Sequence, residues 1–182
     1  TTPGSDEFKF SHDKIQQVLY EDLMPDDIER QLLHQRIGTL IWDSVKDKEP
    51  SEIDDWFVFL AADNLNRAVK LVDYSETRYD LIELNLTASK LATRKAAFLV
   101  AAEYLRIAVG LLDGDTSWNN RYDLCIDLYS TAAEAEKNIA CYGRSSALIK
   151  EIHKRATSLH HQSVAYGIEV NSLAARGDLK GS

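Results

Sequence analysis

The chain has 182 residues, 45% of them hydrophobic and 27% charged, which is enough to bury a sizeable core. Its net charge of −8 at pH 7 disfavours DNA, RNA and an anionic membrane as partners, because their phosphate groups would be repelled. Only three prolines and eight glycines are present, which favours helix over sheet. No apolar run is long enough to span a bilayer and no signal peptide is evident, so we expect a cytoplasmic protein. Cys125 and Cys141 are then expected to be reduced thiols.

The stretch Phe8–Tyr20 predicts a short extended segment that turns into a helix. Phe8 and Phe10 alternate in the period-two pattern of a half-buried strand. Ser11 is a good N-cap, because its hydroxyl can accept from an unpaired backbone N–H of the first turn. Pro25 ends this helix and suits the first turn of the next one. Four apolar residues give the first helix a single apolar face: Ile15, Val18, Leu19 and Leu23.

Two blocks of the sequence resemble a known family. Phe10-Ser11-His12-Asp13, followed by Ile15-Gln16-Gln17 and Tyr20, is similar to a signature of signal-transducing ATPases with numerous domains. Leu33-His34-Gln35-Arg36-Ile37-Gly38-Thr39-Leu40 is similar to a second block of that family. In the family, a nucleotide-binding domain is followed by a winged helix and then by helical repeats. The likeness covers Phe8 to Gly177, and it is to the helical region of multi-sensor histidine kinases and related Ser/Thr kinases.

The resemblance implies a role for His12. In relatives whose winged helix ends in a Met-His-Asp motif, the His contacts bound ADP and helps to hold a closed, inactive state. His12 is the matching position, and Ser11 stands where those relatives have Met. The residues alone support a second interpretation, in which a His in the first turn of a helix serves in capping or packing. A nucleotide contact would need ATP or ADP held by a neighbouring domain, since this segment is expected to carry no cofactor of its own.

Helical spacing predicts seven further helices. The second should bury an apolar face that includes Ile28, Leu32 and Leu40. The third should use Trp56 and Phe57 as core anchors. The fourth is apolar on two sides, so we expect neighbours on both. The predicted helices are Pro25–Val45, Ser51 to Leu71 with an alternative end near Asn64–Asn66, one from Ser75, Lys95–Leu112, Asn120–Ala140, Arg144–His160 and Ser163–Ala175, the last capped by Gly177.

The expected face of the second helix is completed by Ile37, Ile41 and Val45. Further along, a degenerate repeat indicates tetratricopeptide-like hairpins. Ser89 and Ala133 stand at the same place in successive units, 44 residues apart, whereas the usual period is 34. The small and apolar residues of the second helix of each unit follow the same offsets: Phe98, Ala101, Leu105 and Ala108, then Tyr142, Ser145, Ile149 and Ile152.

No pattern of catalytic or metal-binding residues stands out. The loop expected at Asp113–Asn120 starts like a calcium loop, but Trp118 replaces the required glycine and Leu124 the required Glu. We interpret it as turn chemistry, with Trp118 packed on the array. His153 and His160, seven positions apart on one predicted helix, are too far apart to share a zinc ion. Glu134 and Glu136 are expected to be solvated, or paired with Lys137 and Arg144.

The sequence thus predicts an all-α fold, a right-handed array of about seven to eight helices in antiparallel tetratricopeptide-like hairpins, after a short N-terminal extended segment. The expected parts are flexible ends at 1–7 and 177–182, a winged-helix remnant at 8–24, linking helices at 25–72 and repeats at 73–176. We expect a non-enzymatic regulatory segment that binds a protein or peptide and an adjacent nucleotide-binding domain. The alternative is a free-standing adaptor that binds a peptide in its concave groove.

Overall fold

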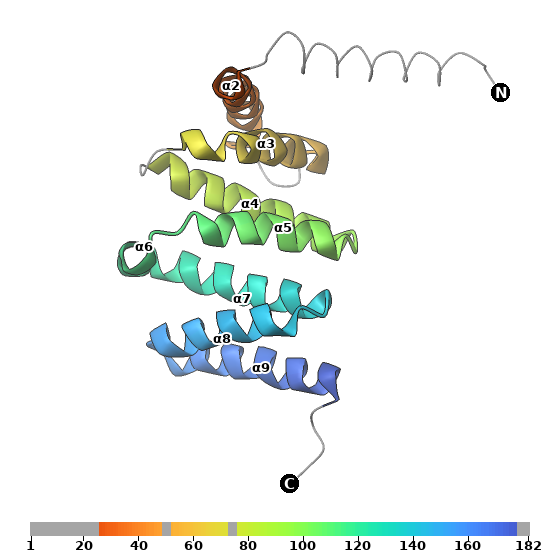
Figure 1. The fold of residues 1–182 in the computed structure, drawn as a ribbon, viewed down its shortest axis with the longest axis vertical. Helices are drawn as coiled ribbons and strands as arrows, with labels where there is room; N and C mark the ends of the chain where they lie inside the picture. The colour runs from red at the N-terminus through yellow and green to blue at the C-terminus, as the bar shows by residue number, and fades with distance from the viewer. Residues whose placement is uncertain (1–25, 49–51, 73–75, 178–182) are drawn as a thin grey trace, which may run out of the picture.

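The computed structural model describes residues 26–48, 52–72 and 76–177. Within these ranges the chain forms eight α-helices and a short 3-10 helix, with no strand, which confirms the predicted all-α array. The helices stack in chain order along one axis (Figure 1). They are α2 (Asp27–Val45), α3 (Asp55–Arg67), η2 (Val69–Leu71, the 3-10 helix), α4 (Glu76–Arg94), α5 (Phe98–Gly110), α6 (Gly114–Asn120), α7 (Tyr122–Asn138), α8 (Tyr142–Arg155) and α9 (Leu159–Arg176).

Several predicted parts lie outside the described residues. They are the end at 1–7, the winged-helix remnant at 8–24 with His12, and residues 178–182. Gly177 caps α9 as predicted, with a left-handed φ of +73° that a glycine adopts without strain. In the part of the chain that is described, no helix is long and apolar enough to cross a membrane.

The buried side of α2 differs from the prediction. Ile28, Leu32 and Leu40 are exposed, although helical spacing predicted that they would be buried. Val45 is buried and Ile41 partly buried, as predicted, but the rest of the buried side is built from Gln31, His34 and Gly38. The reason is close approach, since a Cβ atom on residue 38 would lie 2.6 Å from Cγ of Leu65. Only the glycine side of α2 lets the two helices come this near.

Polar side chains fix the contact between α2 and α3. His34 Nδ1 and Asn64 Oδ1 are 2.8 Å apart, and the Asn64 amide nitrogen donates to the carbonyl of Leu60. Because Asn64 Oδ1 can only accept, His34 must carry its proton on Nδ1 to donate this bond. His34 and Gly38 both belong to the second block that resembles the ATPase family, so its buried members serve helix packing here.

The start of α3 is also corrected. Asp54 is the N-cap, and its carboxylate accepts from the backbone N–H of Trp56 at 3.0 Å, so the helix begins at Asp55 and not at Ser51. Trp56 and Phe57 are exposed, so the prediction that they anchor the core is wrong. They occupy the first turn of α3, and smaller residues fill its contact with α4: Val58, Ala61 and Ala62.

Helix α4 is packed on two sides, as its two apolar faces predicted. Leu84 and Ala88 belong to the core shared with α3, whereas Ile82 and Leu86 belong to the core shared with α5 and α7. The fully buried Asn85 exchanges two hydrogen bonds with Asn66 of α3, at 2.8 and 2.9 Å. A buried amide pair is satisfied in one register only, so this pair fixes how α3 lies on α4.

The segment predicted as a loop at Asp113–Asn120 contains a helix. Seven residues, Gly114–Asn120, form α6, and Trp118 packs into the core below it as predicted. Arg155 of α8 forms an ion pair with Asp115 that joins α6 to the array, and a second ion pair with Glu151 of its own helix holds the Arg155 side chain in place. The inserted helix accounts for the long repeat, since it stands between the hairpin α4–α5 and the hairpin α7–α8.

The turns of the two hairpins are closed by the same backbone hydrogen bonds. After α4, the N–H of Ala97 donates to the carbonyl of Ala92 at 2.9 Å. After α7, the N–H of Cys141 donates to the carbonyl of Glu136 at 2.8 Å. Ala96 and Ala140, 44 residues apart, both have a left-handed φ, of 58° and 60°. This is the Schellman arrangement at both helix ends. The predicted 44-residue period is therefore present in the fold, whereas its tetratricopeptide character stays a prediction.

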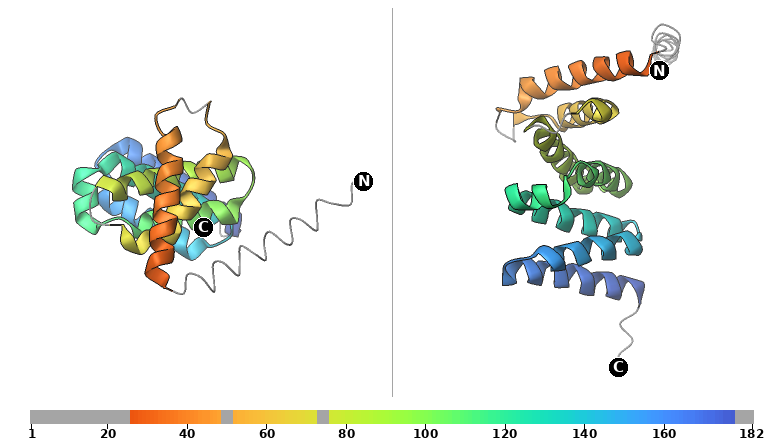
Figure 2. Two further views of the ribbon diagram at one scale, coloured as in Figure 1. Left: turned by 90° about the horizontal axis from the view of Figure 1, so that it is seen from above. Right: turned by 60° about the vertical axis from the view of Figure 1, so that its left-hand side comes forward.

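Beyond this turn, α8 ends at Arg155, earlier than the predicted His160. Ala156 is extended, and the hydroxyl of Ser158 caps α9 by accepting from the N–H of His161 at 3.1 Å. His160 therefore belongs to α9. Neighbouring helices of the stack run in alternating directions from α4 onward, and α2 crosses them at the N-terminal end (Figure 2).

Candidate functional site: an arginine groove beside helix α8

A buried carboxylate lies at the centre of the candidate site. Glu136, on the last turn of α7, is only 3% exposed, so the prediction that it is solvated is wrong. It accepts two hydrogen bonds from Arg106 of α5, at 2.7 Å from Nε and 2.9 Å from Nη2. A bidentate pair of this kind matches the planar guanidinium to both carboxylate oxygens. These bonds raise the pKa of Arg106 above its ordinary value.

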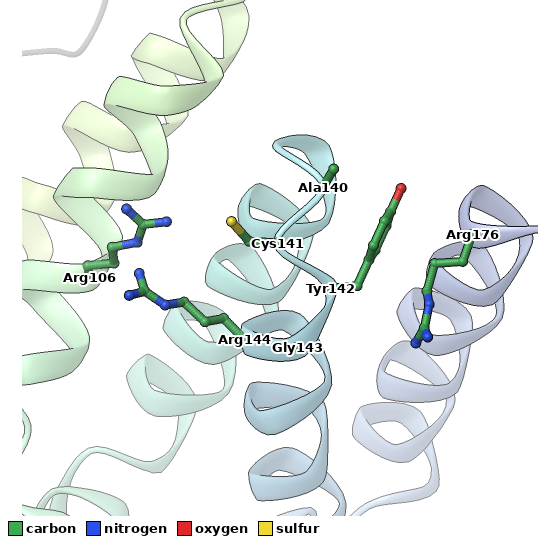
Figure 3. Close-up of a pocket in the computed structure, with 7 residues that line it drawn as sticks. All are labelled: Arg106, Ala140, Cys141, Tyr142, Gly143, Arg144 and Arg176. Atoms are coloured by element: carbon green, nitrogen blue, oxygen red, sulfur yellow. The ribbon is translucent and has the colours of Figure 1, made fainter.

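A second arginine approaches the same carboxylate. Nη1 of Arg144, in the first turn of α8, lies 3.9 Å from Oε1 of Glu136, the pairing that the sequence had offered as an alternative. Figure 3 shows Arg106 and Arg144 pointing toward one another from α5 and α8. The Arg144 side chain is 64% exposed, so most of its donors face solvent. Two cations therefore surround one carboxylate, and the site has an excess of positive charge.

The N-terminus of α8 adds to this positive potential. Cys141 provides no side-chain cap to the helix, so the first-turn N–H groups beside Arg144 are not capped by a side chain. A cation in the first turn also opposes the usual preference of the helix dipole. Tyr142, on the other side of α8, faces Arg176 of α9 (Figure 3). The guanidinium carbon of Arg176 lies 5.8 Å from the centroid of the Tyr142 ring.

An apolar cavity continues the groove. A hollow of about 490 Å³ between α5, α7 and α8, lined in part by Glu136, shares Arg106 and Arg144 with a second hollow of about 680 Å³ at the N-terminal end of α8. Together they form what we call the arginine groove, with a cationic end and an apolar end. The apolar end is lined by Leu105, Val109, Gly110, Ala132, Ala147 and Leu148.

The arginine groove suits an anionic group attached to an apolar one. Arg106 uses two of its five N–H donors on Glu136, and Arg144 has more donors at the surface. Guanidinium groups bind carboxylates and phosphates in two-pronged geometry. The free thiol of Cys141 lies at the edge of the groove, whereas Cys125 is buried in the core, which raises its pKa to about 11.

Sequence reasoning missed this groove. Arg106, Glu136 and Arg144 come from three helices, and only the stacking of those helices brings them together. The available signals were the possible pairing of Glu136 with Arg144 and a cation in the first turn of a helix, where an anion is preferred. His12, the predicted nucleotide contact, lies outside the described residues. Among the residues that are described, no group of three or more His, Cys, Asp and Glu could hold a metal ion.

The fold and groove place the described residues in the class of all-helical arrays with a solvent-open groove. The chain is similar to the hybrid signal transduction histidine kinase G of Dictyostelium discoideum, at 23% identity over 172 residues. That alignment covers 85% of this chain and 5% of the kinase, so the chain spans a small part of its relative. No family model matches the sequence, and no solved structure matches it. The similarity is thus to a signalling protein.

Proposed function

We propose that this chain is a regulatory interaction segment of a multidomain signalling protein and has no catalytic activity of its own. The supporting observation is the similarity to a hybrid signal transduction histidine kinase over most of this chain, within a much longer relative. A stacked helical array is well suited to such a role, because it presents an extended surface while each unit contacts only its neighbours.

The resemblance to multidomain ATPases extends this proposal. The array would then pass the signal of a bound partner or ligand to a nucleotide-binding domain of the same cytoplasmic protein. That domain would hold ATP or ADP, with His12 as a contact to the nucleotide. The coupling requires that the partner bind one of two states of the parent protein more tightly than the other.

The arginine groove is where we place the partner. A protein or peptide segment with acidic and apolar side chains fits its two ends, since the carboxylate would meet Arg144 and Arg106 and the apolar side chain the hollow beside Leu148. The chain as a whole is acidic, with a net charge of −8. An acidic ligand is therefore repelled from most of the surface and attracted at the groove.

Peptide binding to a charge-reversed variant tests this assignment. The probe is a fluorescein-labelled peptide of alternating Glu and Leu, followed by fluorescence anisotropy at two salt concentrations. We expect Arg144→Glu to weaken binding by roughly tenfold or more, because it removes a charge-assisted contact and adds repulsion. Lys150→Glu is the matched control, since Lys150 is an exposed cation of α8 that lines neither hollow. Equal loss in both variants would show non-specific charge attraction instead.

The free-standing adaptor is the second candidate. The observation that favours it is that residues of this chain by themselves line the groove, from α5, α7, α8 and α9. The two candidates separate in a longer protein that carries a nucleotide-binding domain. If the array regulates that domain, Arg144→Glu changes how ATP hydrolysis responds to the peptide. If the chain is an adaptor, the peptide has no effect on hydrolysis in either form.

A further inference from the structure

The turns that close the two hairpins carry exposed apolar side chains. Residues 94–100 contain the turn from α4 to α5, and residues 137–144 contain the turn from α7 to α8. Both turns lie on the same side of the stack (Figure 1), and we call the two segments the turn edge. In the first segment, Phe98, Leu99 and Val100 are 38%, 67% and 42% exposed. A hollow of about 580 Å³ between the two segments is lined without any charged side chain.

Positive charge gathers at the turn edge, although the net charge of the chain is −8. The two segments contain the cations Arg94, Lys95, Lys137 and Arg144, and neither segment contains an Asp or a Glu. The acidic residues that produce the net charge therefore belong to other parts of the chain. An anionic surface would be repelled by most of the molecule and attracted at the turn edge.

Carboxylates border the turn edge on the side of α3. Asp55 lies 3.0 Å from Lys95 and 3.9 Å from Arg94, so it neutralises part of the charge of the first segment. Asp54 and Glu52 precede it in the chain. The excess of positive charge is thus strongest at the second segment, residues 137–144.

We propose that the turn edge docks on an anionic lipid bilayer, with the N-terminal ends of α5 and α8 directed at the membrane surface. Phe98, Leu99 and Val100 are the first three residues of α5, so their side chains point about 100° apart around the helix axis. A groove on a folded partner contacts a helix along one side. A fluid lipid layer can surround the end of a helix, so the exposure of all three side chains favours lipid as the occupant.

The charges complete this assignment. Lys137 and Arg144 can reach lipid phosphates with their charged ends while their stems lie along apolar surface. The acidic residues at the other ends of the helices oppose docking only weakly. Helix α5 has 13 residues and is about 20 Å long, so Asp113, which follows its far end, lies beyond the screening length of about 8 Å at physiological ionic strength.

Co-sedimentation of the whole chain with vesicles tests the docking. The probes are vesicles of phosphatidylcholine alone and vesicles that also contain phosphatidylserine. We expect binding to the mixed vesicles only, and we expect Leu99→Asp to weaken it by roughly tenfold or more, because a charge replaces an apolar side chain that enters the lipid. Leu159→Asp is the matched control, since Leu159 is 85% exposed at the N-terminal end of α9, on the opposite side of the stack. Each change puts an aspartate in the first turn of a helix, where a negative charge is favourable, so both variants should fold.

A second pair of variants tests the electrostatic part. Lys137→Glu should weaken binding to the mixed vesicles by roughly tenfold, because each cation near an anionic surface contributes attraction. Lys154→Glu makes the same change in net charge in the last turn of α8, on the opposite side of the stack, and should bind like the unchanged chain.

Three results would overturn the proposal. The first is that the unchanged chain fails to sediment with the mixed vesicles. The second is equal loss in Leu99→Asp and Leu159→Asp, which would show that binding does not use the turn edge. The third is that Leu99→Asp weakens binding of the Glu–Leu peptide and leaves vesicle binding intact, which would assign the turn edge to a protein partner. Leu99 and Lys137 line neither hollow of the arginine groove, so the proposed function and this docking can fail independently.

Discussion

Ala96 and Ala140 occupy backbone positions where glycine is the usual residue. Each is the left-handed residue after a helix, and each sits in a Schellman turn that closes α4 or α7. An alanine there keeps its Cβ atom close to the neighbouring carbonyl, which costs about 1–2 kcal/mol. The turn persists because its backbone bonds satisfy carbonyls that would otherwise lack donors.

Replacing Ala140 by glycine should therefore stabilise the protein. We expect a gain of about 0.5–1 kcal/mol in the free energy of unfolding, since the relief of strain exceeds the added entropy of the unfolded chain. Chemical denaturation followed by circular dichroism measures it. Ala147→Gly is the control, because Ala147 is an exposed helical residue of α8 and its loss should cost about 1 kcal/mol. Destabilisation by both variants would contradict the left-handed assignment.

At the scale of elements, the contact of α2 with α3 depends on one missing side chain. The Cβ position of residue 38 lies 2.6 Å from Cγ and 3.0 Å from the backbone nitrogen of Leu65. A flexible side chain can rotate away, but the backbone of α3 cannot. The same contact holds the His34–Asn64 hydrogen bond at 2.8 Å, so separation of the helices would also leave a buried polar pair unmade.

Gly38→Ala should separate these helices. We expect a net loss of stability, because overpacking costs about 1–3 kcal/mol and the better helix propensity of alanine returns at most about 1 kcal/mol. Thermal unfolding measures the change. Gly167→Ala in α9 is the matched control, since its Cβ position meets no atom within 4 Å and the substitution should stabilise. If both glycines responded alike, helix propensity and not close approach would decide the outcome.

At the scale of the whole molecule, the array has separate cores along its length. Val58 belongs to the core between α3 and α4, whereas Cys125 and Ile168 belong to the core formed by α6, α7, α8 and α9. Contacts run mainly between neighbouring helices, so opening of one end need not unfold the other. The thiol of Cys125 reports on the C-terminal end, because its pKa of about 11 and its burial make it inert until that end opens.

Labelling of Cys125 at pH 8 should distinguish the two ends. With Cys141 replaced by Ser, we expect Ile168→Ala to speed the reaction with a thiol reagent by roughly thirtyfold or more, as a cavity in the core that holds the thiol lowers the cost of local opening. Val58→Ala makes a cavity in the distant core and should leave the rate nearly unchanged. Equal acceleration by both variants would show that the array opens as one cooperative unit.

The sequence by itself determined the helical class, the two packed sides of α4 and the 44-residue period. These features follow from local spacing of apolar and small residues, which is fixed within one helix or one hairpin. The same spacing misplaced the buried side of α2 and the aromatic pair Trp56 and Phe57, because more than one side of each helix could have been buried.

Only the tertiary structure decided which side of α2 is buried and which charged side chains meet in the groove. Close approach at Gly38 turned α2 so that Gln31 and His34 are buried beside Val45 on the side that meets α3. This is a result of steric fit between Gly38 and Leu65, which are 27 residues apart in sequence. The bidentate pair of Arg106 and Glu136 formed because α5 and α7 stack as neighbours. Periodicity describes one helix at a time, whereas packing and electrostatics depend on which helices meet, and that is a property of the folded chain.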